Sequence, residues 1–163
     1  MWLVGRSYAA AVERGQRTIA GPVTETARFY RIKVARPLRA SGLDEHINRL
    51  HLIDRLTSDN VSTVLAAHAR LVQVLANFVG SRPTSFASKY LHFHSPIAVP
   101  IYDSRATTAL GRQALGRKRM PESFKAYDPV YAQFIHRYLA CRDQIKERYG
   151  YDLTPRQMDR ILW

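Results

Sequence analysis

The sequence predicts an all-α protein, a compact bundle of several helices. Apolar residues recur at three- and four-residue intervals over long stretches, most clearly from Ser58 to Val79. Glycine and proline separate these stretches, and no two alternating segments are joined by a hairpin turn. A chain of 163 residues can bury a substantial core. We therefore expect a single domain over 1–163, with 1–40 as a candidate N-terminal appendage.

Two helices are predicted before residue 40. The first covers 7–20 and ends at Gly21 and Pro22, which break helical hydrogen bonding. The second begins at Thr24 and runs to Pro37. Its apolar residues follow no single period, so an extended conformation over part of it stays open.

Two amphipathic helices follow. Ser41 or Asp44 caps the segment LDEHINRLHLIDRL, in which leucine and isoleucine recur at helical spacing. The next helix is expected from Ser58 to Val79, with Asp59 as its N-cap. Its wide apolar face predicts a central position, and His68 on that face is interpreted as a core histidine.

The C-terminal half contains the predicted site helix and three more helices. The helix that carries Lys89 ends before Pro96, and an extended piece is expected over 97–102. Asp103 then has the position of an N-cap for SRATTALGRQAL. A long helix is predicted from Pro129 to Tyr149, burying Val130, Phe134, Ile135, Tyr138 and Leu139 and exposing Arg137, Arg142 and Lys146. Thr154 and Pro155 start a final helix, whose Leu162 and Trp163 should dock on the core.

The charge balance favours a polyanionic partner. The chain has 25 Lys plus Arg against 13 Asp plus Glu, a formal net charge of +12. Arginine predominates, and it binds phosphate and guanine bidentately, so duplex DNA is the expected partner. Arginine enrichment from genome composition is the alternative explanation. The densest basic cluster consists of Arg112, Arg117, Lys118 and Arg119. This cluster either contacts phosphate or forms a solvated loop, and the sequence leaves both interpretations open.

Several other classes of protein are disfavoured. A lone Cys141 supports neither an intramolecular disulfide nor a cysteine-based zinc site, which indicates a reducing compartment. No apolar run reaches the roughly 18 residues of a membrane span, and the N-terminus lacks the apolar core of a signal peptide. We therefore expect no membrane partner and a cytoplasmic location, nucleoid-associated in a bacterium. His92 and His94 do not complete a metal site, and no phosphate loop appears, so no metal or cofactor is expected.

Lys89 has surroundings that no other lysine of the chain shares. It follows the small residues Ala87 and Ser88 and precedes Tyr90 and Leu91, in a segment that otherwise resembles core. A lysine partly removed from water can act as a nucleophilic amine near neutral pH. Lys89 and Asp103 are therefore the candidate catalytic residues.

The stretch SFASKYLHF, followed by PIYDSRA, resembles the lysine helix and aspartate turn of the helix-hairpin-helix DNA glycosylases, in particular the 8-oxoguanine glycosylase-like proteins. The resemblance covers 83–106 and implies a helix-hairpin-helix glycosylase-like fold and a role in DNA repair. It implies that Lys89 attacks the sugar of a flipped-out nucleotide and forms a Schiff base. AP-lyase activity is a further possibility that the resemblance implies. Asp103 would stabilise the positive charge on the sugar.

The remaining site residues are predicted in two groups. Aromatic side chains near Lys89 would line the pocket for the extruded base: Tyr90, His92, His94 and Tyr102. Nucleic-acid contacts are expected from Ser85, Ser88, Arg105, Arg112, Arg117, Lys118 and Arg119.

Two alternatives to a glycosylase stay open. In the first, the fold binds DNA without chemistry, and Lys89 contacts phosphate or pairs with Asp103. In the second, the chain is a small antitoxin-like or mobile-element interaction protein whose charge serves an unknown protein partner.

Overall fold

The computed structural model of the protein describes residues 32, 34–79, 82–113 and 119–162. Within these ranges every regular element is helical, which confirms the all-α class. The helix expected over 7–20 and most of the one expected from Thr24 lie outside the described residues. The elements are α3 (Ala35–Arg39), α4 (Leu43–His51), α5 (Val61–Val79), α6 (Thr84–His94), α7 (Ser104–Arg112), the 3₁₀ helix η3 (Glu122–Ala126), α8 (Pro129–Tyr149) and α9 (Pro155–Leu162).

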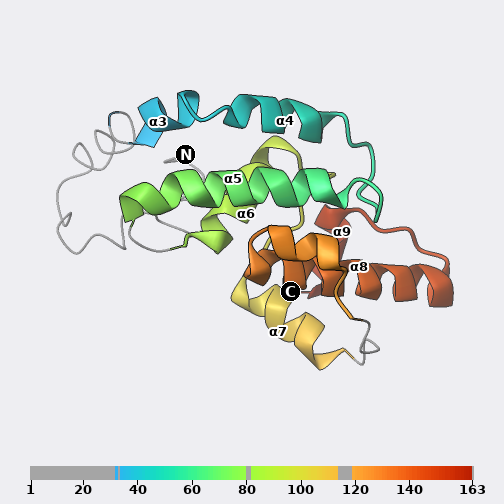
Figure 1. Cartoon of the computed structure of the whole chain (residues 1–163). Helices are drawn as coiled ribbons and strands as arrows, with labels where there is room; N and C mark the ends of the chain where they lie inside the picture. Colours follow the sequence, from blue (N-terminus) through green and yellow to red (C-terminus); the bar gives the residue numbers. More distant parts are fainter. Residues whose placement is uncertain (1–31, 33, 80–81, 114–118, 163) are drawn as a thin grey trace.

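Helix α5 is the central element, as its apolar face predicts. It runs through the middle of the molecule, with α3 and α4 along one side and α7 and α8 toward the other (Figure 1). It packs against α4, α6 and α8. The buried stripe consists of Val61, Val64, Leu65, His68, Leu71, Val72 and Leu75.

The bounds of α3 and α4 differ from those predicted. Helix α3 passes through Pro37, which is its third residue. Proline lacks a backbone N–H, and the N–H groups of the first helical turn have no hydrogen-bond partner within the helix, so proline is tolerated there. Helix α4 starts after Gly42 (φ 70°), and the Ser41 hydroxyl accepts a hydrogen bond from the Leu43 N–H at 3.2 Å. It ends at His51 and not at Leu56.

Helix α5 begins at Val61, two residues after the predicted cap Asp59. The exposed Asp59 carboxyl accepts from the Ser58 hydroxyl at 3.4 Å and not from a described backbone N–H of α5. Asn60 organises this turn instead: its Oδ1 accepts from the Thr57 N–H at 2.9 Å and its Nδ2 donates to the Arg55 carbonyl at 2.7 Å.

Helix α8 has the predicted bounds, but the predicted burial of two of its residues is wrong. Val130 is exposed, whereas Arg142 is buried and not on the solvent face. The guanidinium of Arg142 donates to the Leu56 carbonyl and pairs with Asp143. Because α4 ends early, the Leu56 carbonyl has no helical partner of its own, and Arg142 supplies one.

The final helix follows its predicted signals. Thr154 Oγ1 accepts from the Gln157 N–H at 3.3 Å while Gln157 Oε1 accepts from the Thr154 N–H at 2.9 Å, the reciprocal pattern of a capping box. Leu162 is buried in the core, as expected, and Trp163 lies outside the described residues. None of the described helices is both long and apolar enough to cross a membrane.

Candidate functional site

The connector between α6 and α7 runs over 95–103 and brings the two predicted catalytic residues near each other. It opens with a turn at 96–98, which includes the first two residues of the extended piece expected over 97–102, and no regular element is assigned from there to Asp103. Ser95 Oγ donates to the Leu50 carbonyl at 3.3 Å, which fixes the start of the connector to α4.

Ser88 ties the far end of this connector to the lysine helix. Its buried hydroxyl accepts from the Tyr102 N–H at 3.0 Å and donates to the Ser85 carbonyl at 2.9 Å. Lys89 and Asp103 are the next residues after this bonded pair. The hydrogen bond therefore holds the backbone at Lys89 alongside the backbone at Asp103.

Asp103 is the N-cap of α7, as predicted. Its backbone is extended (φ −147°, ψ 176°), and its Oδ1 accepts from the Ala106 N–H at 2.8 Å. The side chain is partly exposed. A carboxylate in this position is oriented by the helix and favoured by its N-terminal dipole.

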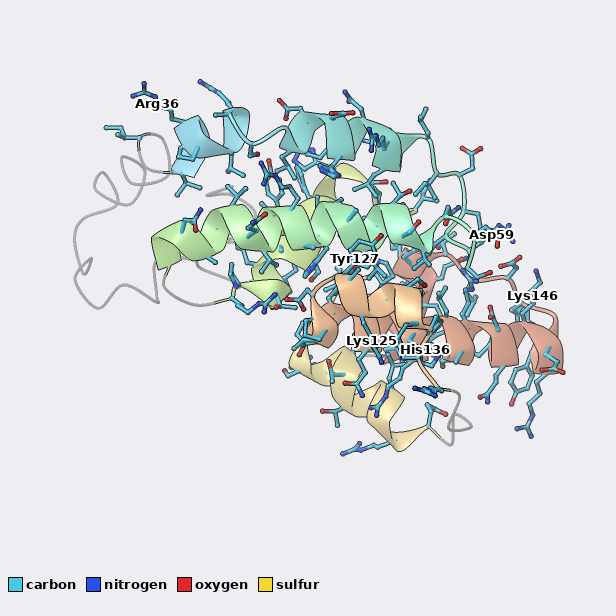
Figure 2. All side chains as sticks on the ribbon, in the orientation of Figure 1. Arg36, Asp59, Lys125, Tyr127, His136 and Lys146 are labelled. Carbon is cyan, nitrogen blue, oxygen red and sulfur yellow. The ribbon has the colours of Figure 1, made fainter. Side chains whose placement is uncertain are left out.

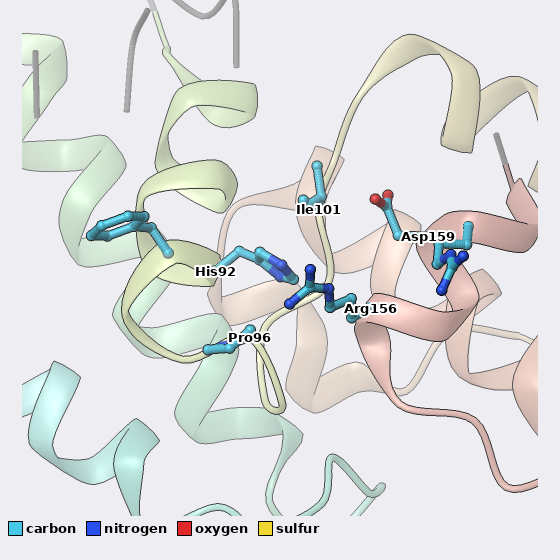
Figure 3. Close-up of a pocket in the computed structure, with 7 residues that line it drawn as sticks. His92, Pro96, Ile101, Arg156 and Asp159 are labelled. Carbon is cyan, nitrogen blue, oxygen red and sulfur yellow. The ribbon is translucent and has the colours of Figure 1, made fainter. Parts of the chain in front are cut away.

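A cleft of about 590 Å³ opens beside this pair. Figure 3 shows His92 of α6 and Arg156 of α9 facing each other across it, with Asp159 turned toward the connector that carries Ile101. Residues three and four apart lie on one helix face, so the partly exposed Lys89 shares its face with His92 and Phe93 and lies beside the cleft, one turn from it. The lining consists of His92, Phe93, Pro96, Ile101, Arg156, Asp159 and Arg160.

Asp159 connects the cleft to the predicted pair electrostatically. Its carboxyl lies within electrostatic range of Lys89, His92 and Asp103. Burial raises the pKa of Asp159, and the Asp103 carboxylate raises it further, while His92 and Lys89 partly offset both effects. The site thus holds two carboxyls in different environments.

His92 presents an acceptor to the cleft. Its Nδ1 lies 2.7 Å from the Val99 carbonyl oxygen, which can only accept, so Nδ1 carries the ring proton and Nε2 keeps its lone pair. Burial lowers the pKa of His92 more than this hydrogen bond raises it. The ring is therefore a neutral acceptor at physiological pH, which fits its predicted place in a pocket.

The other three predicted pocket residues do not line this cleft. Tyr90 and His94 lie on the opposite face of α6, where their rings meet edge to face at 4.7 Å. The His94 carbonyl lies 3.0 Å from the His51 ring nitrogen, which places this face against α4. Tyr102 lines a separate, small hollow with residues of α7 and α8. Residues two apart diverge on a helix, so the sequence H-x-H divides between two faces.

The residues predicted to contact nucleic acid differ in exposure. Ser88 is fully buried and bonded within the protein, so it cannot contact DNA, whereas Ser85 is partly exposed. Arg105, Arg112 and Arg119 are exposed on and after α7. Arg117 and Lys118 lie outside the described residues.

Of the described residues that line the cleft, only His92 was predicted as a pocket residue. The charged lining residues that were missed are Arg156, Asp159 and Arg160. They lie on α9, which packs against α7, and the sequence pattern marked that helix only as C-terminal scaffold. The available signal was the polar face of α9, where Arg156 and Arg160 are four residues apart. Nothing in the sequence shows that this face turns toward α6.

The described residues contain no group of three His, Cys, Asp or Glu side chains that could hold a metal ion. Comparison of the chain with protein-family models, with curated proteins and with solved structures found no match. The candidate function therefore rests on the residues themselves.

Proposed function

We propose that the protein is a lysine-dependent DNA glycosylase that removes a damaged or modified base, with associated AP-lyase chemistry. The observation that supports the proposal is the Ser88–Tyr102 hydrogen bond, because it holds the backbone at Lys89 alongside the backbone at Asp103. His92, one helical turn after Lys89, lines a cleft. The helix-hairpin-helix glycosylase-like fold is part of the same proposal.

The chemistry needs a nucleophile, a fixed negative charge and a pocket. The Lys89 amine attacks C1′ of the nucleotide while the glycosidic bond breaks and its electron pair leaves with the base. Asp103, held by the Ala106 N–H, stabilises the positive charge on the sugar. A cleft of about 590 Å³ is large enough for one extruded base, and the Phe93 and Pro96 side chains supply apolar surface for it.

The charge of the surroundings supports a nucleic-acid substrate. Arg156 and Arg160 at the cleft are exposed, and exposed arginines of the adjacent α7 extend the basic surface. Together with the net charge of +12, this surface suits the phosphate backbone of duplex DNA. The basic surface also suits DNA binding without chemistry, and the experiment below separates the two.

Borohydride trapping tests the proposal. The purified protein is incubated with duplexes that contain oxidised, deaminated or abasic sites, and Lys89→Ala and Lys125→Ala are run beside it. We expect a covalent adduct with the wild type and with Lys125→Ala, whose lysine is exposed and pairs with Glu122, but not with Lys89→Ala. An adduct that survives in Lys89→Ala would refute the assigned nucleophile.

Failure of the wild type on every duplex would reject the enzyme. Salt-sensitive DNA binding that persisted in that case would indicate the non-catalytic DNA-binding module. Loss of DNA binding as well would indicate a protein partner.

A further inference from the structure

Among the described residues that line the cleft, Asp159 is the one that carries a carboxyl. It projects from α9 toward the connector that leads to Asp103 (Figure 3). The side chain is partly buried and lies within electrostatic range of both Lys89 and Asp103. It therefore lies in the cleft that the proposed function assigns to the extruded base.

The two carboxyls of the site have contrasting environments. Asp103 is the N-cap of α7, and its Oδ1 accepts from the Ala106 N–H at 2.8 Å, which fixes the orientation of its carboxyl. Burial and the neighbouring Asp103 charge instead raise the pKa of Asp159, which favours its protonated form. Two carboxyls held in different environments are suited to different roles in one reaction.

We propose that Asp159 is the general acid of the site, donating its proton to the base as the glycosidic bond breaks. This inference rests on the proposed function and adds a catalytic residue to it. Asp103 keeps its charge for the sugar, and Asp159 serves the leaving group.

The step balances in atoms and charge. The lone pair of Lys89 Nζ forms a bond to C1′, and the electron pair of the C1′–N bond passes to the base. The Asp159 proton moves to the base, which leaves neutral, and Asp159 becomes a carboxylate. Nζ then loses a proton, its lone pair forms the C=N bond of the Schiff base as the C1′–O4′ bond breaks, and that proton ends on O4′. Asp159 takes a proton back from water before the next turnover.

Charged and titratable groups face Asp159 from each neighbouring element. Lys89 and His92 come from α6, and Asp103 from the start of α7. Tyr138 of α8 also lies within electrostatic range, and Asp159 contributes to the raised pKa of its buried hydroxyl. On α9 itself, Arg156 and Arg160 line the same cleft.

The experiment uses two substrates and three variants. Base release is measured from pH 4 to 9 on a duplex of the trapping panel from which the wild type frees a base, and borohydride trapping is measured on an abasic-site duplex. The variants are Asp159→Asn, Asp159→Glu and the control Asp54→Asn, which changes an exposed aspartate of the loop after α4. Circular dichroism checks that each variant is folded.

Asp159→Asn should slow base release by about 100-fold, the lower range for general acid catalysis. It should also remove the fall in rate toward high pH, because the amide has no acid proton to lose. Trapping on the abasic site should stay within about threefold of the wild type, because no base departs there. Asp159→Glu should restore part of the rate and the falling limb, and Asp54→Asn should match the wild type.

Two outcomes overturn the inference in distinguishable ways. A wild type that neither frees a base nor traps on any duplex rejects the proposed function, and the role of Asp159 with it. An active wild type whose rate and pH profile are unchanged in Asp159→Asn rejects the general acid alone. Equal losses on both substrates would likewise reject it in favour of a positioning role.

Discussion

The Ser88 hydroxyl accepts a hydrogen bond from the Tyr102 N–H at 3.0 Å, inside the protein and 14 residues away along the chain. Ser88 precedes Lys89 and Tyr102 precedes Asp103, so one small side chain sets the spacing of the candidate catalytic pair. A larger residue at 88 would separate α6 from the connector. The small residues before Lys89 thus have a packing role, whatever the chemistry of the lysine.

Ser88→Ala should destabilise the protein and reduce trapping together. The substitution leaves the partly buried Tyr102 N–H without its acceptor, which costs about 1 kcal/mol. It also loosens the spacing of Lys89 and Asp103, so we expect a trapping rate at least about tenfold lower. Urea denaturation gives the stability and borohydride trapping gives the rate.

Ser123→Ala, on the exposed surface of η3, is the matched control and should leave both quantities unchanged. If Ser88→Ala unfolds at the same urea concentration as the wild type, the hydrogen bond does not hold the connector as described.

Helix signals in this sequence were readable because they are local. Pro129 to Tyr149 is the observed extent of α8, and Asp103 and Thr154 cap their helices where predicted. The end of α4 was misplaced because Ile53 and Leu56 are buried in a turn that keeps an apolar spacing without helical hydrogen bonds. Spacing reports which residues face the core and not whether the backbone between them is helical.

The candidate site was predictable in one half only. Lys89, His92 and Asp103 lie within one continuous segment of sequence, and their unusual surroundings are visible there. Arg156, Asp159 and Arg160 reach the cleft through the packing of α9 on α7, a contact between elements that are more than 40 residues apart in the chain. Local pattern carries no information about such a contact, so half of the site required the fold.

His68 should make the protein sensitive to acid. The ring is fully buried, stacks on Tyr131 at 3.7 Å between centroids and lies 3.0 Å from the Thr84 carbonyl through Nε2. Burial lowers the pKa of His68 from 6.5 to about 4. Below pH 6.5 the unfolded chain therefore binds a proton at His68 that the folded chain excludes. The free energy of unfolding keeps its full value above pH 6.5 and falls by roughly 3 kcal/mol as the pH drops to about 4.

Urea denaturation at several pH values between 7 and 4 measures this loss. His92, whose pKa burial also lowers, contributes in the same direction, so His92→Gln serves as a comparison that removes its share. A free energy of unfolding that stayed level from pH 6.5 to 4 in His92→Gln would show that His68 is not held neutral.

Arg142→Ala should destabilise the fold far more than a typical arginine substitution. The side chain is 8% exposed and donates to the Leu56 carbonyl, which joins α8 to the loop after α4. Its removal leaves a cavity and a carbonyl without a donor, for which we expect a loss of about 2 to 4 kcal/mol. Arg137→Ala on the same helix is exposed and should change stability by less than about 0.5 kcal/mol.

Thermal or urea denaturation of Arg142→Ala and Arg137→Ala, run side by side, measures the two changes in stability. Equal effects would mean that Arg142 reaches solvent and that its contact with the loop contributes nothing.

Arg156 and Arg160 should control how strongly DNA binding depends on salt. Both side chains are exposed at the cleft, and each phosphate that an arginine neutralises adds about 0.9 to the slope of log affinity against log salt concentration. The double variant Arg156→Ala with Arg160→Ala should therefore lower that slope by about 2 on a duplex of any sequence. Arg36 of α3 points outward at the far side of the molecule (Figure 2), so Arg36→Ala is the control.

Fluorescence anisotropy between 50 and 200 mM salt measures the slopes. A slope that falls in the double variant and holds in Arg36→Ala places the phosphate backbone at the cleft, where Lys89 can reach a nucleotide. A slope that falls equally in both would indicate that the net charge of +12 attracts DNA without a preferred face. In that case DNA would not bind preferentially at the cleft, and a small molecule or a protein would be the next ligand to test there.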